Sequence, residues 1–311
     1  MKILVTGGTG LVGKAIEKIS KKYKNYSFIF INSKICDLTN YSKTLEYFKN
    51  VKPDMVIHLA ACVGGLFKNM NYKVDMLEKN LTINYNVLKC SHQIGVKKCV
   101  SCLSTCIFPD KTTYPINENM LHNGPPHTSN DAYAYAKRML EIHSKAYREQ
   151  YGSNFVCVIP TNIYGPHDNY HLEDAHVIPA LIHKCYLAKK NKDPFIVRGS
   201  GKPLRQFIFS EDLARLILWT LEKYNDKESI ILSVSEKDEV SIGNVAEMIA
   251  KEFDYYDNMK YDTNYSDGQY KKTADNSKLM KLYGDYKFIT IKEGIQRSVQ
   301  WFKENYNECR K

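Results

Sequence analysis

The chain has 311 residues, of which 43% are hydrophobic and 25% charged, and its formal net charge is +10 at pH 7. This length and composition are typical of an ordinary soluble protein with a sizeable core, and no apolar run of about 18 residues predicts a membrane span. The lysines are scattered and form no long basic run. That distribution favours a small anionic ligand over a nucleic-acid partner.

The nine cysteines do not have the spacing of a zinc site or of a disulfide framework. Cys99 and Cys102 are three apart in a predicted strand, so they point to opposite faces and cannot readily share a metal. We therefore expect no metal site and mostly small buried thiols in a reducing compartment. Because the chain starts on a core strand, we expect no signal peptide and a cytoplasmic protein.

The first element is a short apolar run, Ile3 to Val5, which predicts a buried strand. Gly7, Gly10 and Gly13 follow, and an amphipathic helix begins near Leu11. A strand, a glycine turn and a helix in this order predict a site for the pyrophosphate of a dinucleotide, whereas a lone glycine triplet would indicate only a surface loop. The predicted cofactor contacts in this turn are Gly7, Gly8, Thr9, Gly10, Leu11, Val12 and Gly13.

Strand-like and helix-like segments then alternate through the first half of the chain. The predicted strands are Ile29–Ile31, Met55–Leu59, Cys99–Leu103 and Phe155–Ile159, with helical periodicity near 40–50, 74–95 and 133–150. Such alternation predicts right-handed βαβ crossovers, and hence a Rossmann-type doubly wound parallel sheet. We expect a smaller mixed α/β C-terminal domain for the substrate.

The expected domain bounds follow from where the alternation stops. Residues 1–165 and 204–233 are expected to form the NADP-binding domain. Residues 166–203 and 234–311 are expected to form the substrate domain, with a helix ending near 187, a strand at Phe195–Val197 and two or three helices in the tail.

The end of the second predicted strand bears on the choice between NAD and NADP. It reads Asn32-Ser33-Lys34, with no carboxylate before Asp37. Small polar residues and a lysine fit a 2′-phosphate better than a free 2′-hydroxyl, so we expect NADPH/NADP, although Lys34 alone is equally consistent with a solvated surface lysine. The further cofactor contacts expected here are Ser33, Lys34, Asp37 and Leu38, with Ala60 and Ala61 after the third strand.

The candidate chemistry follows the fourth predicted strand. Ser104 comes at its end, and Tyr133 and Lys137 lie four apart, on one face of the next helix. A nearby ammonium favours the phenolate, so we expect Lys137 to lower the pKa of Tyr133 toward acid–base chemistry at neutral pH. These three residues predict a site that protonates a carbonyl oxygen during hydride transfer. Tyr135 is two residues from Lys137 and faces elsewhere.

These residues resemble the extended short-chain dehydrogenase/reductase family. Within that family, the stretches 101–109, 122–127, 160–169, 176–181 and 266–274 are most similar to the branch that epimerises and then reduces a GDP-bound 4-keto sugar. The resemblance runs from Lys2 to the C-terminus. It implies that GDP-4-keto-6-deoxy-D-mannose is epimerised at C3 and C5 and reduced at C4 with NADPH to give GDP-L-fucose.

The resemblance also assigns roles to residues. It implies that Cys106 is the epimerisation base and His176 the acid, with Tyr133 as acid for the reduction and Lys137 and Ser104 in support. Without it, a lone cysteine would indicate packing and His176 the start of a helix. Further implied cofactor contacts are Tyr133, Lys137, Pro160, Thr161, Asn162, Ile163 and His176.

Positive side chains in the second half are candidates for a diphosphate, because Arg and Lys bind phosphate well. The substrate contacts implied by the resemblance are Asn162, Lys184, Arg198, Arg205, Asp267 and Lys271. Any single one is equally consistent with a solvated surface charge. The resemblance also implies a homodimer, in which the helices near 74–95 and 133–150 pair with their copies.

Two other functions are consistent with the same features. One is another nucleotide-sugar epimerase or dehydratase of the family, for which Cys106 and His176 would be dispensable. The other is an inactive NADP-sensing protein, which the presence of both Tyr133 and Lys137 argues against.

Overall fold

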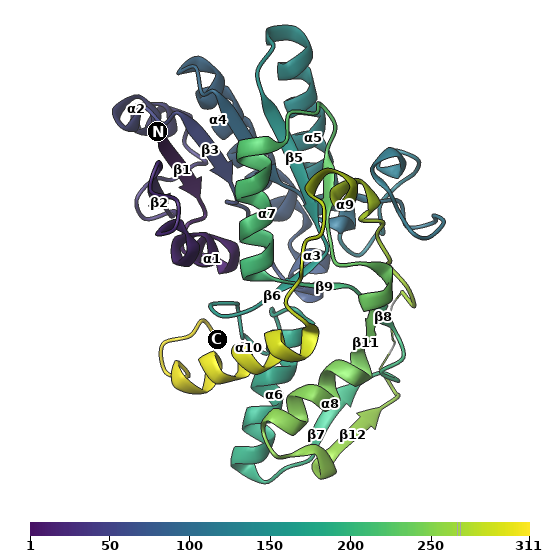
Figure 1. Ribbon diagram of the computed structural model, residues 1–311. Helices are drawn as coiled ribbons and strands as arrows, with labels where there is room; N and C mark the ends of the chain where they lie inside the picture. The colour runs from purple at the N-terminus through teal and green to yellow at the C-terminus, as the bar shows by residue number, and fades with distance from the viewer. Residues whose placement is uncertain (266, 268) are drawn as a thin grey trace. The chain divides into compact units, whose positions relative to one another are not determined.

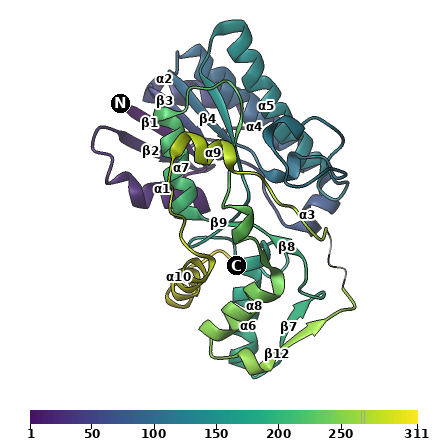
Figure 2. The same cartoon turned by 45° about the vertical axis from the view of Figure 1, so that its right-hand side comes forward.

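The computed structural model describes residues 1–265, 267 and 269–311, except the side chains of residues 66 and 67 (Figure 1; Figure 2). Ser266 and Gly268, in the last stretch of the resemblance, lie outside the described residues. The chain divides into two compact units. The first contains residues 1–112, 118–160 and 211–232, and the second contains residues 113–117, 161–210 and 233–311. The assignment of one to the cofactor and the other to the substrate stays a prediction.

The first unit is built on a six-stranded sheet in the order β10-β5-β4-β3-β1-β2. Its strand bounds are β1 Lys2–Thr6, β2 Ser27–Ile31, β3 Met55–His58, β4 Lys98–Cys102, β5 Phe155–Pro160 and β10 Ile230–Leu232. Every neighbouring pair is parallel. Strands β3, β4 and β5 are buried along their whole length, because helices cover both faces of the sheet.

Helices on the two faces follow from right-handed crossovers in opposite directions. Helices α2 (Tyr41–Val51), α4 (Lys73–Gln93) and α5 (Asp131–Tyr151) pack together on one face (Figure 1). Helices α1 (Leu11–Ser20) and α7 (Ser210–Lys223) share the other, where Lys18 forms an ion pair with Glu211 (2.6 Å). Short elements complete the unit: α3 Leu66–Asn71, η1 Thr105–Ile107 and η2 Glu118–Met120.

The order of the strands reverses at β1. The chain runs from β1 outward to β2 and then returns to β3 on the other side of β1. Ligands of open α/β sheets bind at such a switch point, outside the carboxyl ends of the strands. The glycine turn after β1 and the segment after β3 meet here, because a Cβ on Gly7 would lie 2.9 Å from the backbone nitrogen of Ala60.

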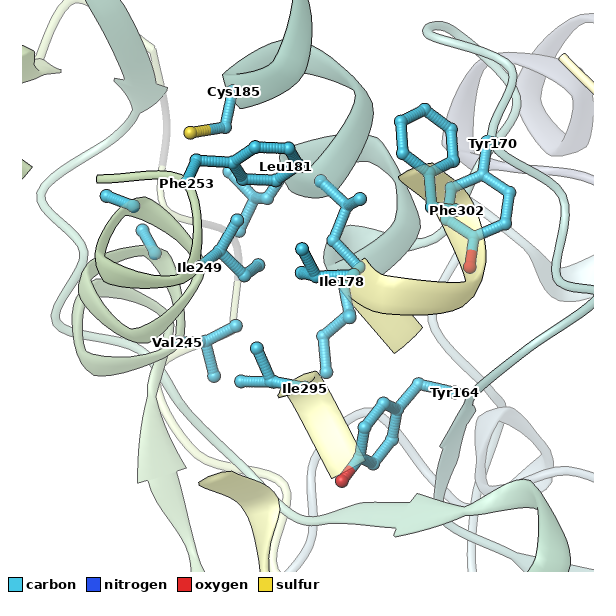
Figure 3. Close-up of a cluster of buried hydrophobic side chains, with 14 of the residues drawn as sticks. Tyr164, Tyr170, Ile178, Leu181, Cys185, Val245, Ile249, Phe253, Ile295 and Phe302 are labelled. Atoms are coloured by element: carbon cyan, nitrogen blue, oxygen red, sulfur yellow. The ribbon is translucent and has the colours of Figure 1, made fainter. Parts of the chain in front are cut away.

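The second unit is held together by a core of its own, drawn in Figure 3. Helices α6 (Val177–Asn191), α8 (Ile242–Glu252) and α10 (Ile291–Glu304) pack against one another around it. The labelled core side chains are Tyr164, Tyr170, Ile178, Leu181, Cys185, Val245, Ile249, Phe253, Ile295 and Phe302. Its strand pairs are β6 (Asn162–Tyr164) with β9 (Phe207–Phe209), β7 (Phe195–Arg198) with β12 (Met259–Asp262), and β8 (Leu204–Arg205) with β11 (Val240–Ser241). The remaining elements are α9 Ser277–Tyr283, η3 Glu236–Asp238 and η4 Tyr256–Asn258.

The elements predicted for the sheet are confirmed, with small shifts at their ends. The third and fourth strands end at His58 and Cys102, one residue earlier than expected. The short strand β6 was not expected, because Asn162 to Tyr164 carries no alternation that marks it as a strand. Over the residues described, no helix is long and apolar enough to cross a membrane, and no group of three or more His, Cys, Asp or Glu residues could hold a metal ion.

Candidate functional site

The glycine turn has the backbone that close approach to a phosphate requires. Gly7 has a φ of +68°, a conformation that glycine adopts without strain. A Cβ on Gly13 would lie 2.6 Å from the carbonyl oxygens of Gly7 and Gly8, so only glycine lets α1 begin this close to β1. The N-terminus of α1 begins directly after this turn, and its N-cap residue Gly10 makes no side-chain capping bond. A helix N-terminus of this kind is suited to binding a phosphate.

The end of β2 is organised by its own side chains. Asn32 Oδ1 accepts hydrogen bonds from the backbone N–H groups of Lys34 (3.0 Å) and Ile35 (3.1 Å). Asp37 accepts from both the N–H and the hydroxyl of Thr39, and these bonds lower the pKa of Asp37. The side chains of Ser33 and Lys34 are exposed. This leaves the Lys34 ammonium available to a phosphate at the edge of the sheet.

Ser104 and Cys106 are placed by the turn that ends β4. Ser104 is the N-cap of η1, and its hydroxyl oxygen lies 3.4 Å from the backbone nitrogen of Cys106. Cys106 itself is 9% exposed. The serine hydroxyl and the thiol are thus presented by one short 3₁₀ turn at the carboxyl end of the sheet.

Helix α5 brings the predicted Tyr–Lys pair to this turn. The ammonium of Lys137 lies 5.8 Å from the centre of the Tyr133 ring and donates a hydrogen bond to the carbonyl oxygen of Cys102 (2.7 Å). Tyr133 interacts electrostatically with Cys106. Ser104, Cys106, Tyr133 and Lys137 are therefore held at one place in the first unit. Tyr135 is 43% exposed on another face of α5, as its spacing predicted.

The expected direction of the Tyr133 pKa is wrong. Burial raises the pKa of Tyr133 well above its ordinary value, and the nearby thiols Cys106, Cys102 and Cys62 add to the rise. Burial also lowers the pKa of Lys137. The physical reason is that desolvation penalises both charged forms more than the pair can compensate. The phenol keeps its proton, which suits an acid that donates to a carbonyl oxygen.

Sequence reasoning missed two residues at this site. Cys62, after β3, is part of the electrostatic environment of Tyr133, and its backbone N–H donates to Asn80 Oδ1 (2.9 Å). Arg138, on α5, is 7% exposed and donates from Nε to the carbonyl oxygen of Ile107 (2.6 Å). An arginine next to the predicted Lys137 carries no signal of burial, because neighbouring residues of a helix face different directions.

His58 is a core histidine whose two ring nitrogens both have hydrogen-bond partners. Its Nε2–H donates to Asn84 Oδ1 (3.0 Å), so Nδ1 accepts from the Thr6 hydroxyl (2.9 Å). The Thr6 oxygen in turn accepts from the N–H of Ala60 (3.2 Å), and the Asn84 amide donates to the carbonyl oxygen of Ala136 (3.4 Å). Burial lowers the pKa of His58 to about 3 and keeps the ring neutral. This chain of bonds joins the end of β1, next to the glycine turn, to α5.

The remaining predicted catalytic residue, His176, belongs to the second unit. It is the N-cap residue of α6, and its side chain is exposed and makes no capping bond. Desolvation by the surrounding protein lowers its pKa. The positive end of the α6 dipole also disfavours an imidazolium there. The ring is therefore mainly neutral near pH 7, and its protonated form is a stronger acid than that of an ordinary histidine.

Three of the predicted substrate contacts are cations without a carboxylate partner. In the part of the chain that the structure describes, Lys184, Arg198 and Arg205 form no ion pair. Desolvation and then the Arg198 charge lower the pKa of Lys184, so these two cations lie close together. Arg205 donates to the carbonyl oxygen of Gln269 (2.8 Å), and burial lowers its pKa. Such a group attracts an anion.

Asp267 and Lys271 have local partners instead. Asp267 accepts from the N–H (2.6 Å) and the hydroxyl (2.7 Å) of Ser200, and so holds the turn after β7. Lys271 pairs with Glu236 (2.8 Å) and lies 3.9 Å from Glu239, which offsets its charge. Their predicted contact with substrate stays a prediction.

The other predicted cofactor contacts are spread over both units. Ala60 and Ala61, after β3, are half-buried, and Pro160 ends β5. In the second unit, Thr161 donates to the Ser233 hydroxyl (3.1 Å). Asn162 donates to the carbonyl oxygen of Gln206 (2.9 Å), and Ile163 follows it on β6.

Known proteins match this chain over its whole length. A model of the NAD dependent epimerase/dehydratase family matches residues 3–235. The GDP-L-fucose synthase of Dictyostelium discoideum is 56% identical, covering 99% of this chain and 97% of that protein. A probable GDP-L-fucose synthase of Drosophila melanogaster is 51% identical, covering 100% and 99%. The crystal structure of a GDP-L-fucose synthetase from Naegleria fowleri bound to NADP superposes with a TM-score of 0.96 at 52% identity, covering 100% of this chain and 95% of that chain.

Proposed function

This chain belongs to the NAD dependent epimerase/dehydratase family, and from that premise we propose that it makes GDP-L-fucose. The substrate is GDP-4-keto-6-deoxy-D-mannose, which is epimerised at C3 and C5 and then reduced at C4 with NADPH. The observation that carries the proposal is the position of Cys106. A thiol held beside Ser104, Tyr133 and Lys137 adds a base to the residues that a simple ketone reductase needs.

In the epimerisation, the C4 ketone acidifies the hydrogens at C3 and C5. Cys106 in its thiolate form takes a proton from carbon and becomes a neutral thiol, and the electron pair passes into the enolate. His176, in its protonated form, returns a proton to the opposite face of the carbon and becomes a neutral imidazole. Desolvation and the α6 N-terminus lower its pKa, which makes this protonated form a stronger acid than an ordinary histidine.

In the reduction, bound NADPH supplies the hydride. Tyr133 donates its proton to the C4 oxygen, and its raised pKa means that the proton is present when the oxygen becomes an alkoxide. Ser104 offers a hydroxyl to the same oxygen. Lys137 is anchored on the Cys102 carbonyl, and its Nζ lies 5.8 Å from the centre of the Tyr133 ring.

Cations support the choice of both ligands. Lys184, Arg198 and Arg205 can bind the diphosphate of the GDP-sugar. Lys34, exposed at the end of β2, can bind the 2′-phosphate that distinguishes NADP from NAD.

We also propose a cytoplasmic homodimer. The exposed apolar side chains Tyr135, Met139 and Ile142 recur at helical spacing on one face of α5. On α4, which packs against α5, Val74 and Tyr85 are exposed three turns apart. An apolar surface of this kind favours pairing with a second copy. The nine free thiols, all within described residues, are consistent with a reducing compartment.

The test is to mix the protein with NADPH and GDP-4-keto-6-deoxy-D-mannose in deuterated water, and to follow absorbance at 340 nm and product mass. We expect loss of NADPH together with deuterium at two carbons. Tyr133→Phe should retain deuterium uptake while NADPH consumption falls at least 100-fold, and Cys106→Ser should lose deuterium uptake.

The other outcomes identify the alternatives. NADPH consumption that persists in Cys106→Ser would favour a different epimerase or dehydratase of the family. NADPH binding without turnover of the sugar nucleotide would favour the sensor.

A further inference from the structure

Arg138 is a buried cation whose charge has no obvious purpose in the fold. Arg138 is 7% exposed, and its Nε donates a hydrogen bond to the carbonyl oxygen of Ile107. Its Nη2 atom is buried without a hydrogen-bond partner. Within the described residues Arg138 forms no ion pair. Burying a charge in this way is costly unless an anion compensates it.

The tether to Ile107 brings the guanidinium to the 3₁₀ turn η1, in which Ile107 directly follows Cys106. Burial lowers the pKa of Arg138, whereas negative charge on Tyr135 and Cys106 raises it. Tyr135 is 43% exposed, and the Arg138 guanidinium lies over its ring, 5.6 Å from the ring centre. Tyr135 therefore makes a cation–π contact with Arg138 and does not provide a buried negative charge. The buried group that can become an anion next to Arg138 is the Cys106 thiol.

Other ionisable groups also face Cys106. Lys137 and Tyr133 interact with it electrostatically from α5. Lys137 donates to the Cys102 carbonyl, and burial favours its neutral form. The guanidinium of Arg138 has a far higher intrinsic pKa and stays charged when buried. Of the two cations, Arg138 is thus the permanent one.

We propose that Arg138 is the counter-ion that holds Cys106 as a thiolate, and so is a positioning residue for the epimerisation. The inference rests on the proposed role of Cys106 as base. The thiol releases its proton to solvent before the sugar binds, and the resulting charge pair satisfies the buried guanidinium. When the thiolate takes a proton from C3 or C5, the negative charge moves to the enolate, which remains within the field of Arg138.

The experiment measures the thiolate directly and needs no sugar. The full-length protein is treated with iodoacetamide between pH 5 and 10, and the rate of alkylation of the Cys106 peptide is followed by mass spectrometry. We expect a midpoint at least one pH unit below the usual thiol range. Arg138→Gln should move it up by at least one unit, which is a tenfold loss of thiolate at pH 7, and Arg138→Lys should restore part of the shift.

The matched control is Arg148→Gln. Arg148 is on the same helix and also donates to a backbone carbonyl, but that carbonyl belongs to Phe155 on β5 and not to Ile107 on η1. This variant should leave the Cys106 midpoint unchanged. In the reaction with NADPH and GDP-4-keto-6-deoxy-D-mannose in deuterated water, Arg138→Gln should shift the pH profile of deuterium uptake by the same amount. It should leave the affinity for NADPH unaltered.

An unchanged midpoint in Arg138→Gln would overturn the proposal. If that variant does not fold, a midpoint at or above the usual thiol value in the native protein overturns it equally. If the Cys106 alkylation midpoints are as expected but the native protein takes up no deuterium, the counter-ion role is upheld and the proposed reaction is refuted. The two failures are therefore distinguishable.

Discussion

Tyr133 and Lys137 lie one helical turn apart on α5. Burial raises the pKa of Tyr133 and lowers the pKa of Lys137, so it favours the neutral form of each side chain. Asp168, in the second unit, is a third case: its carboxyl is 5% exposed, with one oxygen that has no hydrogen-bond partner. Burial raises the pKa of Asp168 to about 7, although a bond from the Asn169 N–H and the Arg310 charge oppose the rise. At the residue scale, desolvation determines which groups carry a proton at neutral pH.

Asp168 makes stability dependent on pH. Its folded pKa is raised above the unfolded value, so the unfolded state loses the proton first and stability falls as pH rises from about 4 to about 7. The difference between the folded and unfolded pKa of Asp168 corresponds to at most about 4 kcal/mol in the free energy of unfolding. We expect Asp168→Asn to raise the melting temperature at pH 8 and to leave it nearly unchanged at pH 4.5, measured by calorimetry.

Asp267→Asn is the control for that prediction. Asp267 is exposed, and its hydrogen bonds from Ser200 lower its pKa, the opposite direction. No stabilisation at pH 8 is expected for it. A melting temperature of Asp168→Asn that follows the native protein at every pH would contradict the assignment.

A substitution at Gly13 tests whether the glycine turn after β1 binds the cofactor. A Cβ there would lie 2.6 Å from backbone atoms of Gly7 and Gly8, so the turn itself must move. We expect Gly13→Ala to weaken NADPH binding at least tenfold in a fluorescence titration. Gly95→Ala is the matched change: φ is +72° and nothing lies within 4 Å, so it should cost about 1–2 kcal/mol of stability and leave NADPH affinity unaltered.

At the scale of elements, the chain from Thr6 through His58 and Asn84 to Ala136 connects β1, β3, α4 and α5. Each donor points the same way along it, which favours cooperative strengthening. The bonds set the position of α5, which carries Tyr133 and Lys137, relative to the glycine turn.

Asn84→Leu breaks this chain and leaves buried groups on His58 and Ala136 unpaired, at a cost of about 1–3 kcal/mol. We expect kcat for ketone reduction to fall, with a smaller change in NADPH affinity, in steady-state and binding assays. Asn86→Leu is the comparison, because that buried amide donates to the Leu38 carbonyl (2.8 Å) and supports the end of β2. It should weaken NADPH binding instead. The same effect from both variants would contradict separate roles.

At the scale of the whole molecule, the proposed homodimer depends on the exposed apolar face of α5. Met139 is 47% exposed between Tyr135 and Ile142 on that face. A glutamate there would bury a charge at the interface. We expect the native protein to have twice the 35.9 kDa chain mass by light scattering, and Met139→Glu to have the mass of one chain.

Leu282→Glu controls for surface charge. Leu282 is 50% exposed on α9, away from both interface helices in the sequence. Its variant should keep the mass of the dimer. A native protein with the mass of one chain, or a dimer that survives Met139→Glu, would refute pairing through α5.

Local patterns were sufficient to predict much of this molecule. The apolar runs located the sheet strands, the glycine spacing located the tight turn after β1, and a separation of four residues placed Tyr133 and Lys137 on one helix face. The resemblance, and not spacing, singled out Cys106 and His176. These features are readable because each depends on residues that are close in the sequence.

By itself, the sequence determined the doubly wound parallel sheet, its glycine turn and the Ser104, Tyr133 and Lys137 set. Only the tertiary structure decided how those groups are charged. Burial reversed the expected direction of the Tyr133 pKa, made His58 a neutral link in a hydrogen-bond chain, and enclosed Arg138 beside η1. The physical reason is that desolvation and long-range hydrogen bonds depend on which segments surround a side chain, and those segments are distant in the sequence.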